Sequence, residues 1–208
     1  MTKRPATDPL VVGFDLDMTL VDSRPGIRAS FAALVAETGV EIDAETVVGR
    51  LGPPLEIELA NWVEDARVAE LAARYRAHYF VLGVPGTTLL PGARDAVEAV
   101  HARGGRALVV TAKEERGARA CLEHVGLNID VVVGLRYGEG KVAALREHAA
   151  TVYVGDTVTD IESGLAAKAA AVGVTTGPDS AEALHVAGAD TVLDSLDAFP
   201  AWLDVFAR

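Results

Sequence analysis

Residues 10–23 of this 208-residue chain read LVVGFDLDMTLVDS, an apolar run that ends in two carboxylates, Asp15 and Asp17. A short and uniformly apolar run is typical of a buried strand in a parallel sheet. Two neighbouring anions at the end of such a strand repel one another and lose hydration, so a positive group has to compensate them. The stretch therefore predicts a buried strand with a charged site at its carboxyl end.

Further apolar runs alternate with helical patterns along the chain. The runs lie at 10–14, 106–110, 131–134, 151–154 and 170–174, and helical patterns between them include 92–103 and 114–125. Short apolar strands that alternate with helices predict an α/β protein whose parallel sheet is covered on both faces. Because crossovers are right-handed, we expect a Rossmann-like, doubly wound sheet built from residues 1–23 and 89–208.

The segment 24–88 breaks this alternation, since it contains no convincing strand. Ser23 can cap a helix that ends at Gly39, and a second amphipathic helix is expected at about 65–80. The sequence GRLGPP at 49–54 is a turn-rich break between them. We expect residues 24–88 to form an inserted all-α cap domain over the sheet.

Composition excludes several classes of partner. The net charge is −11 and no stripe of Lys or Arg offsets it, so we expect no binding to nucleic acid. No apolar run approaches the ~18 residues of a membrane span. The single cysteine, Cys121, fits a small core residue in a reducing cytoplasm. We expect a cytoplasmic monomer or homodimer.

Three of the predicted strands are followed by a polar side chain that could bind a ligand or take part in catalysis. The strand at 10–14 is followed by Asp15, the strand at 106–110 by Thr111, and the strand at 151–154, after a glycine, by Asp156. Ligands bind at the carboxyl ends of the strands in an open parallel sheet. The sequence therefore predicts a site at this one edge.

The stretch GDTVTDIES adds another carboxylate, Asp160, four residues after Asp156. The two can face the same way if a helical turn starts there, with Thr159 or Asp160 as cap of a helix over 161–170. Carboxylates that converge in this way repel strongly, and a hard divalent cation resolves the repulsion. Mg²⁺ prefers oxygen ligands and commonly shares its coordination sphere with a substrate phosphate. Lys141, which opens a predicted helix over 142–148, is a candidate phosphate contact.

These residues resemble the motifs of the haloacid dehalogenase superfamily, in particular its phosphatase branch. The matching stretches are DLDMT at 15–19, Thr111 after an apolar strand, Lys141, and GDTVTD at 155–160. Within that branch the chain looks most like the phosphoglycolate-phosphatase-like proteins with a small helical cap.

The resemblance implies catalytic roles for named side chains. Asp15 is the nucleophile that forms an aspartyl-phosphate, and Asp17 protonates the leaving alcohol and then activates water. Thr111 and Lys141 hold the phosphoryl oxygens, with help from the backbone N–H of Ala112.

The resemblance also implies a magnesium site. Its ligands are the carboxylates of Asp15 and Asp156 and the backbone carbonyl of Asp17, with Asp160 near the ion or in its outer shell.

One position departs from the family pattern, which usually has glycine where this chain has Met18. Methionine tolerates positive φ poorly, so either the turn does not require positive φ or the backbone near the phosphate is altered. In the predicted cap, Arg50 is a candidate substrate contact. Asp22 is either a hinge residue or within reach of substrate.

The sequence thus predicts a Mg²⁺-dependent phosphatase that hydrolyses a small soluble phosphate monoester. Two alternatives stay open at this point. One is a sugar-phosphate mutase on the same scaffold, and the other is a phospho-acceptor signalling module, which would form a stable phosphoprotein without turnover.

Overall fold

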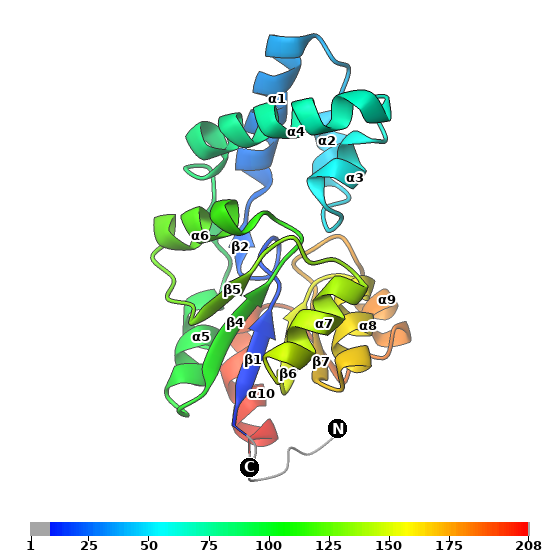
Figure 1. Cartoon of the computed structure of the whole chain (residues 1–208). Helices are drawn as coiled ribbons and strands as arrows, with labels where there is room; N and C mark the ends of the chain where they lie inside the picture. The colour runs from blue at the N-terminus through cyan, green and yellow to red at the C-terminus, as the bar shows by residue number, and fades with distance from the viewer. Residues whose placement is uncertain (1–8, 208) are drawn as a thin grey trace.

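The computed structural model describes residues 9–207. At its centre is a six-stranded parallel sheet in the order β5-β4-β1-β6-β7-β8 (Figure 1). The strands are β1 (Val11–Phe14), β4 (Arg106–Val110), β5 (Val131–Val133), β6 (Val152–Gly155), β7 (Ala170–Val174) and β8 (Thr191–Leu193). The predicted α/β, doubly wound class is confirmed. The edge strand β8 was not predicted, because its three half-buried residues give no apolar run.

Alternation of side chains along each strand divides the core between the two faces of the sheet. One face packs against α5 (Ala93–His101), α6 (Glu115–His124) and α10 (Phe199–Phe206). The other packs against α7 (Glu139–Glu147), α8 (Val158–Ala167) and α9 (Ala181–Val186). In β4, for example, Val109 belongs to the first face and Leu108 to the second.

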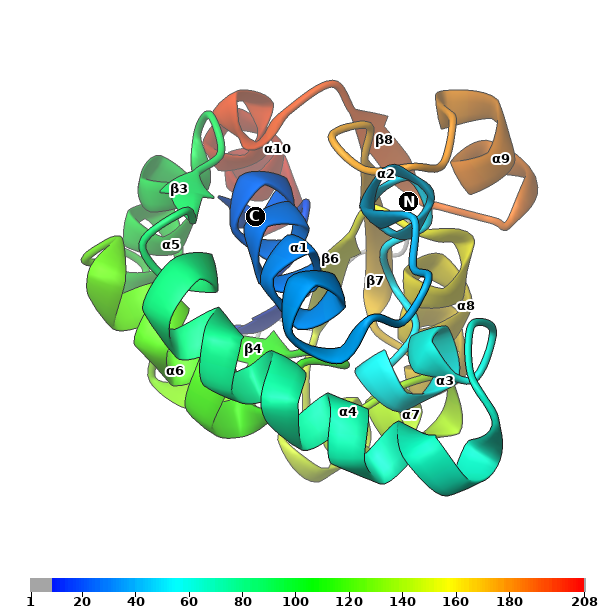
Figure 2. The ribbon, with the colours of Figure 1, turned by 90° about the horizontal axis from the view of Figure 1, so that it is seen from above.

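A segment of helices follows β1 and lies beyond the carboxyl edge of the sheet (Figures 1 and 2). It contains α1 (Arg24–Thr38), α2 (Ala44–Val48), α3 (Leu55–Leu59), α4 (Asp65–His78) and the π-helical turn η1 (Tyr79–Gly83). A two-stranded antiparallel pair, β2 (Val21–Asp22) and β3 (Thr88–Leu89), joins it to the sheet. Because β3 begins at residue 88, the predicted strand-free segment reaches one residue into this short pair.

The helical segment has a hydrophobic cluster separate from the clusters of the sheet. Phe31, Leu34, Leu71 and Tyr75 are at its centre, and the rings of Phe31 and Tyr75 lie 4.4 Å apart. Cys121 of α6 is buried in the same cluster, as a small core residue. The helical segment therefore has its own core, which also contacts one helix of the sheet layer.

Three predicted helix boundaries are wrong by a few residues. The helix predicted over 161–170 is α8, which begins at Val158 because Thr157, and neither Thr159 nor Asp160, is its cap. Lys141 lies inside α7, in its first turn, whereas the sequence pattern placed it just before the helix. The helix predicted to about residue 80 ends at 78 and continues as η1.

Two further structural facts bear on the sequence predictions. Within residues 9–207, none of the helices is both long and apolar enough to cross a membrane. Residues 1–8 and 208, which the predicted core domain includes, lie outside the described part of the chain.

Candidate active site

Three carboxylates from two loops of the sheet meet at its carboxyl edge. Asp15 follows β1, Asp156 follows β6, and Asp160 lies in the first turn of α8. Each offers an oxygen within 4.8 Å of the other two, and all three residues are buried. The convergence expected from the sequence is therefore present for these three side chains.

Lys141 is the cation that faces this cluster. Its Nζ donates to Asp160 at 2.6 Å and to Asp15 at 3.1 Å, and its side chain is almost fully buried. Burial by itself would lower the pKa of Lys141, but the two carboxylates raise it well above the usual range. Lys141 is therefore charged, and it compensates one of the three negative charges.

The pKa values of two of these aspartates are raised. Burial raises the pKa of Asp15 to about 7; Lys141 opposes this shift, and Asp160 and Asp17 add to it. Burial also raises the pKa of Asp156 well above its usual range, with repulsion from Asp160 and Asp15 adding to the shift. A site with this unbalanced charge and these oxygen donors fits a hard divalent cation such as Mg²⁺.

The donors around Asp160 distinguish it from the other two aspartates. Besides Lys141, it accepts hydrogen bonds from the Tyr153 hydroxyl at 3.2 Å and from the Thr157 hydroxyl at 2.6 Å, and the Thr157 N–H closes a capping box. Both of its oxygens are thus engaged within the chain. Asp160 is held as a positioning residue for Lys141, and Asp15 and Asp156 keep more freedom to bind an ion.

Asp156 is oriented by two features of the neighbouring loops. The buried hydroxyl of Thr19, in the loop after β1, donates to its Oδ1 at 2.6 Å. On its other side, a Cβ added at Gly177 would lie 1.8 Å from Oδ2, so only glycine leaves room for this carboxylate. The sequence motif contained Thr19, but nothing in the pattern pointed to Gly177.

Asp17 lies apart from the three-carboxylate cluster. Its Oδ2 pairs with Nζ of Lys113 at 3.1 Å, and its buried Oδ1 has no hydrogen-bond partner among the described residues. The Lys113 ammonium also lies 4.4 Å from the centre of the Tyr79 ring. Asp17 thus lines a cavity and keeps one carboxylate oxygen that no described residue occupies.

Lys113 was not predicted from the sequence. Burial opposes its charge, but Asp17 raises the pKa of Lys113 well above the usual range. The sequence feature that could have pointed to Lys113 is its position two residues after Thr111, in the loop that follows β4. The Thr111 hydroxyl accepts from the Lys113 N–H at 3.2 Å, so the two residues share one turn.

The turn after Asp15 does require positive φ. Met18 has φ of 62° and is almost fully buried. Its N–H donates to the Val21 carbonyl at 2.8 Å, and its carbonyl accepts from the Thr176 hydroxyl at 2.5 Å. The turn therefore keeps its shape with methionine in the position where the family pattern has glycine.

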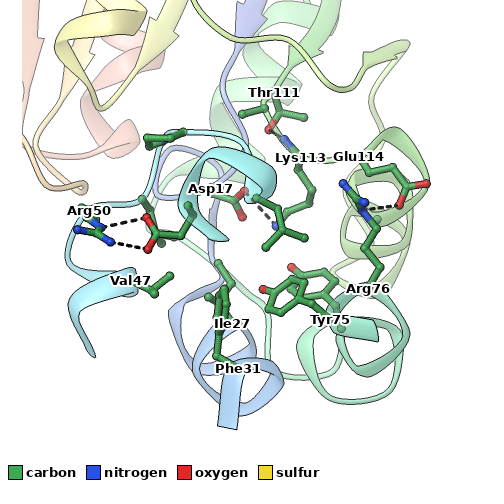
Figure 3. A pocket seen from close by; sticks show the side chains of 18 of the residues that line it. Asp17, Ile27, Phe31, Val47, Arg50, Tyr75, Arg76, Thr111, Lys113 and Glu114 are labelled. Atoms are coloured by element: carbon green, nitrogen blue, oxygen red, sulfur yellow. Dashed lines mark hydrogen bonds and ion pairs between the residues drawn. The ribbon is translucent and has the colours of Figure 1, made fainter. Parts of the chain in front are cut away.

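A cavity lies between the sheet edge and the helical segment, with a volume of about 100 Å³ (Figure 3). A cavity of this size is well above what a single water needs and suits a small molecule. Asp15, Asp17, Thr111, Ala112 and Lys113 line it on the sheet side. Lys141, Asp156 and Asp160 are not part of its lining.

Arg50 lines the cavity from the helical side, where the sequence predicted a substrate contact, and two of its guanidinium nitrogens, Nε and Nη2, are paired with Glu58. Its guanidinium makes two hydrogen bonds to Glu58, at 2.7 and 2.9 Å, and lies 5.6 Å from the centre of the Trp62 ring. Asp22 lies outside the cavity lining and accepts from the Arg24 backbone and guanidinium, which favours the hinge interpretation.

Buried, oppositely charged side chains at the carboxyl edge of a parallel sheet define a candidate active site of an α/β enzyme, and comparison with known proteins specifies the family. A model of the haloacid dehalogenase-like hydrolases matches residues 12–174. The chain is 33% identical to a phosphoglycolate phosphatase of Rhodospirillum rubrum, covering 94% of this chain and 91% of that protein. This chain belongs to the haloacid dehalogenase-like hydrolase family.

Two more matches agree with this assignment. The chain is 31% identical to a probable phosphatase, IndB, of Dickeya dadantii, over 90% of each protein. Among solved structures, a haloacid dehalogenase-like hydrolase of Streptococcus pneumoniae has the same fold, with a TM-score of 0.79, 24% identity and coverage of 96% of this chain and 99% of that one. The resemblance seen in the sequence motifs is confirmed.

Proposed function

We propose that this protein is a Mg²⁺-dependent phosphatase that hydrolyses a small phosphate monoester through a phosphorylated Asp15. The observation that supports this most is the convergence of Asp15, Asp156 and Asp160 around Lys141 at the sheet edge. The two relatives reported above, which are named as a probable phosphatase and a phosphoglycolate phosphatase, point to the same chemistry.

In this proposal Asp15 attacks phosphorus and Asp17 transfers protons. The bond between phosphorus and the leaving oxygen breaks as Asp17 donates a proton to that oxygen. Asp17 then removes a proton from the water that cleaves the aspartyl-phosphate, which returns both carboxyl groups to their starting states. The unpartnered Oδ1 of Asp17 is the atom available for both transfers.

Thr111, the Ala112 N–H and Lys141 bind the phosphoryl oxygens in this proposal. Thr111 and Ala112 directly follow β4 and Lys141 lies in the first turn of α7, so regular elements hold these groups at the sheet edge. Asp160 positions Lys141, since it accepts the shorter of the two lysine hydrogen bonds.

Asp15, Asp156 and the Asp17 backbone carbonyl would hold Mg²⁺, with Asp160 in the outer shell. When bound, the ion neutralises negative charge on the transferring phosphoryl group. The proposal is supported by the raised pKa of Asp15 and Asp156, because burial and, secondarily, repulsion from neighbouring carboxylates disfavour their charged forms, which a bound cation would stabilise.

The helical segment over residues 24–88 would act as a cap that covers the cavity and excludes water while Asp15 is phosphorylated. Location in the cytoplasm, the lack of membrane and nucleic-acid partners, and a monomeric or homodimeric state stay predictions from the sequence.

A phosphate-release assay over a panel of phosphate esters tests the function, with Asp15→Asn as the blank. We expect multiple turnover with Mg²⁺, loss of activity with EDTA, and no activity in the variant. Full activity in Asp15→Asn, or activity unaffected by EDTA, would contradict the proposal.

The same preparation separates the two alternatives. Conversion of a hexose 1-phosphate to its 6-phosphate would indicate a mutase. A stable phosphoprotein that does not turn over p-nitrophenyl phosphate would indicate a phospho-acceptor module.

A further inference from the structure

The wall of the cavity that faces the leaving group is predominantly apolar. Its helical side is formed by side chains from α1, α2, the loop after α2, α3, α4 and η1, and the aliphatic and phenylalanine side chains among them are Ile27, Phe31, Val47, Leu51, Leu55 and Phe80. Ile27, Phe31 and Val47 lie together below Asp17 in Figure 3. A group that leaves from phosphorus toward Asp17 therefore enters hydrocarbon surroundings.

The cations that line this cavity are each paired with a carboxylate of the chain. Arg50 is held by Glu58 through two hydrogen bonds, and Lys113 pairs with Asp17 at 3.1 Å. Arg76 lies 2.6 Å from a carboxylate oxygen of Glu56 and 3.6 Å from one of Glu114. These three are the cations of the lining, all of whose residues lie in the described part of the chain.

An anionic leaving group would lie beside apolar side chains and cations that are already paired, so its binding would be unfavourable. A carboxylate on the substrate would have to share a cation with Glu58, Asp17 or Glu56, whose charge already balances that cation, or lie unpaired after losing its hydration. An uncharged alkyl or aryl group needs no partner and gains from contact with the apolar side chains.

Resting on the proposed phosphatase function, we infer that the substrate is a phosphate monoester of an uncharged, predominantly apolar alcohol. This differs from phosphoglycolate, the compound named for several relatives, whose leaving alcohol carries a carboxylate. At about 31–33% identity, relatives can keep the sheet-edge residues and differ in the cavity wall.

Two esters of nearly the same shape test this inference. Isobutyl phosphate and phosphoglycolate are both esters of primary alcohols, with an isopropyl group in the first where the second has a carboxylate. We expect kcat/KM for isobutyl phosphate to be at least about 10-fold higher, a ratio that apolar pockets readily produce. The assay uses the full chain with Mg²⁺, with p-nitrophenyl phosphate as reference and Asp15→Asn as blank.

A substitution links the preference to the paired cations. Glu58→Gln frees the Arg50 charge and keeps an oxygen for the hydrogen bond from Trp62 Nε1, so the fold is maintained. We expect this change to shift the kcat/KM ratio toward phosphoglycolate by about 10-fold or more, one good ion pair being worth that much. Glu45→Gln is the matched control, since it removes the same charge from the Arg28–Glu45 pair outside the cavity.

Turnover of p-nitrophenyl phosphate without a preference for isobutyl phosphate over phosphoglycolate would overturn this inference alone. An equal shift in Glu45→Gln and Glu58→Gln would also overturn it, because net charge and not the cavity wall would then set the preference. Failure to release phosphate from any of the three esters above the blank would overturn the proposed function, and this inference with it.

Discussion

The sheet side and the helical side of the cavity differ in how their charged side chains are balanced. On the sheet side, three buried carboxylates converge within a few ångströms around one lysine, and burial raises the pKa of Asp15 to about 7. On the helical side, apolar side chains dominate and the charges present are paired off. Excess negative charge is suited to binding a cation, which together with Lys141 can then hold a phosphate, whereas balanced charge and apolar surface are suited to selecting a leaving group.

This difference also has an origin in the fold. The sheet side consists of residues at strand ends, whose backbone is fixed by the parallel ladder of β1, β4 and β6. The helical side consists of side chains from several short helices that share their own cluster. Reaction chemistry would therefore change little if the helical side were altered, and the predictions that follow test this separation.

The largest expected effect is on proton transfer. Asp17→Asn should lower kcat/KM for an alkyl phosphate by about 10²–10⁴-fold, because the alcohol then leaves without a proton. The loss should be much smaller for p-nitrophenyl phosphate, whose phenolate leaves without one. Steady-state kinetics with both esters measure this. Asp22→Asn, outside the cavity lining, is the control. Equal losses on the two esters would remove Asp17 from the role of general acid.

The next effect concerns the cation. Asp156→Asn should raise the Mg²⁺ concentration needed for half-maximal activity by at least about 100-fold, since one of the buried carboxylates around the ion is lost. Activity titrated against Mg²⁺ measures it. Glu162→Gln on the exposed side of α8 should leave the titration unchanged. An unaltered Mg²⁺ requirement in Asp156→Asn would contradict the metal assignment.

Stability in the absence of metal gives a third test. Because the pKa of Asp15 is raised to about 7 in the folded state, the native protein binds more protons than the unfolded chain between about pH 4 and 7. The metal-free protein should therefore lose stability as pH rises toward 7, by up to about 1.4 kcal/mol per pH unit for such a group.

Urea unfolding at pH 5.5, 6.5 and 7.5 in EDTA measures this loss. Mg²⁺ should reduce it, because the ion compensates the charge, and Asp15→Asn should reduce it because the carboxyl is gone. A metal-free protein that becomes more stable over this range would contradict the account of the sheet side.

The smallest effect tests the turn at Met18. Glycine there would relieve the left-handed backbone, worth about 1–2 kcal/mol, but would lose a buried side chain worth about 1.5–3 kcal/mol. Because the loss of the buried side chain outweighs the relief of backbone strain, Met18→Gly should lower Tm by a few degrees, at roughly 2–4 °C per kcal/mol.

Ala149 offers a matched control for this change. It also has positive φ, 53°, but its side chain is exposed, so Ala149→Gly relieves strain at no cost in burial and should raise Tm. A Tm that rises in Met18→Gly would show that the methionine side chain contributes little to the folded state.

Much of the sheet side could be predicted from the sequence. Apolar runs gave five of the six strands, and the residues that follow three of them, Asp15, Thr111 and Asp156, fix the position of the site. This works because strand order and crossover handedness bring carboxyl ends together wherever the strands lie in the chain.

The rest depends on contacts that leave no periodic pattern. The pairing of Lys113 with Asp17, and of Glu58 with Arg50, joins residues on different turns or elements, so only the structure reveals them. The helix that carries Asp160 was predicted too late, because Thr157 forms a capping box in which Asp160 is the third helical residue. The sequence contained those residues, but several capping choices were equally compatible with it.

The most direct test of the central claim is to find the atom that carries phosphorus during turnover. The enzyme is mixed with a phosphate ester and Mg²⁺, quenched in acid within the first turnover, digested and mapped by mass spectrometry. The account predicts a single phosphoryl group on the peptide that contains Asp15, with none on Asp15→Asn. Phosphorylation at another residue, or full turnover with no phosphoenzyme at any time, would contradict it.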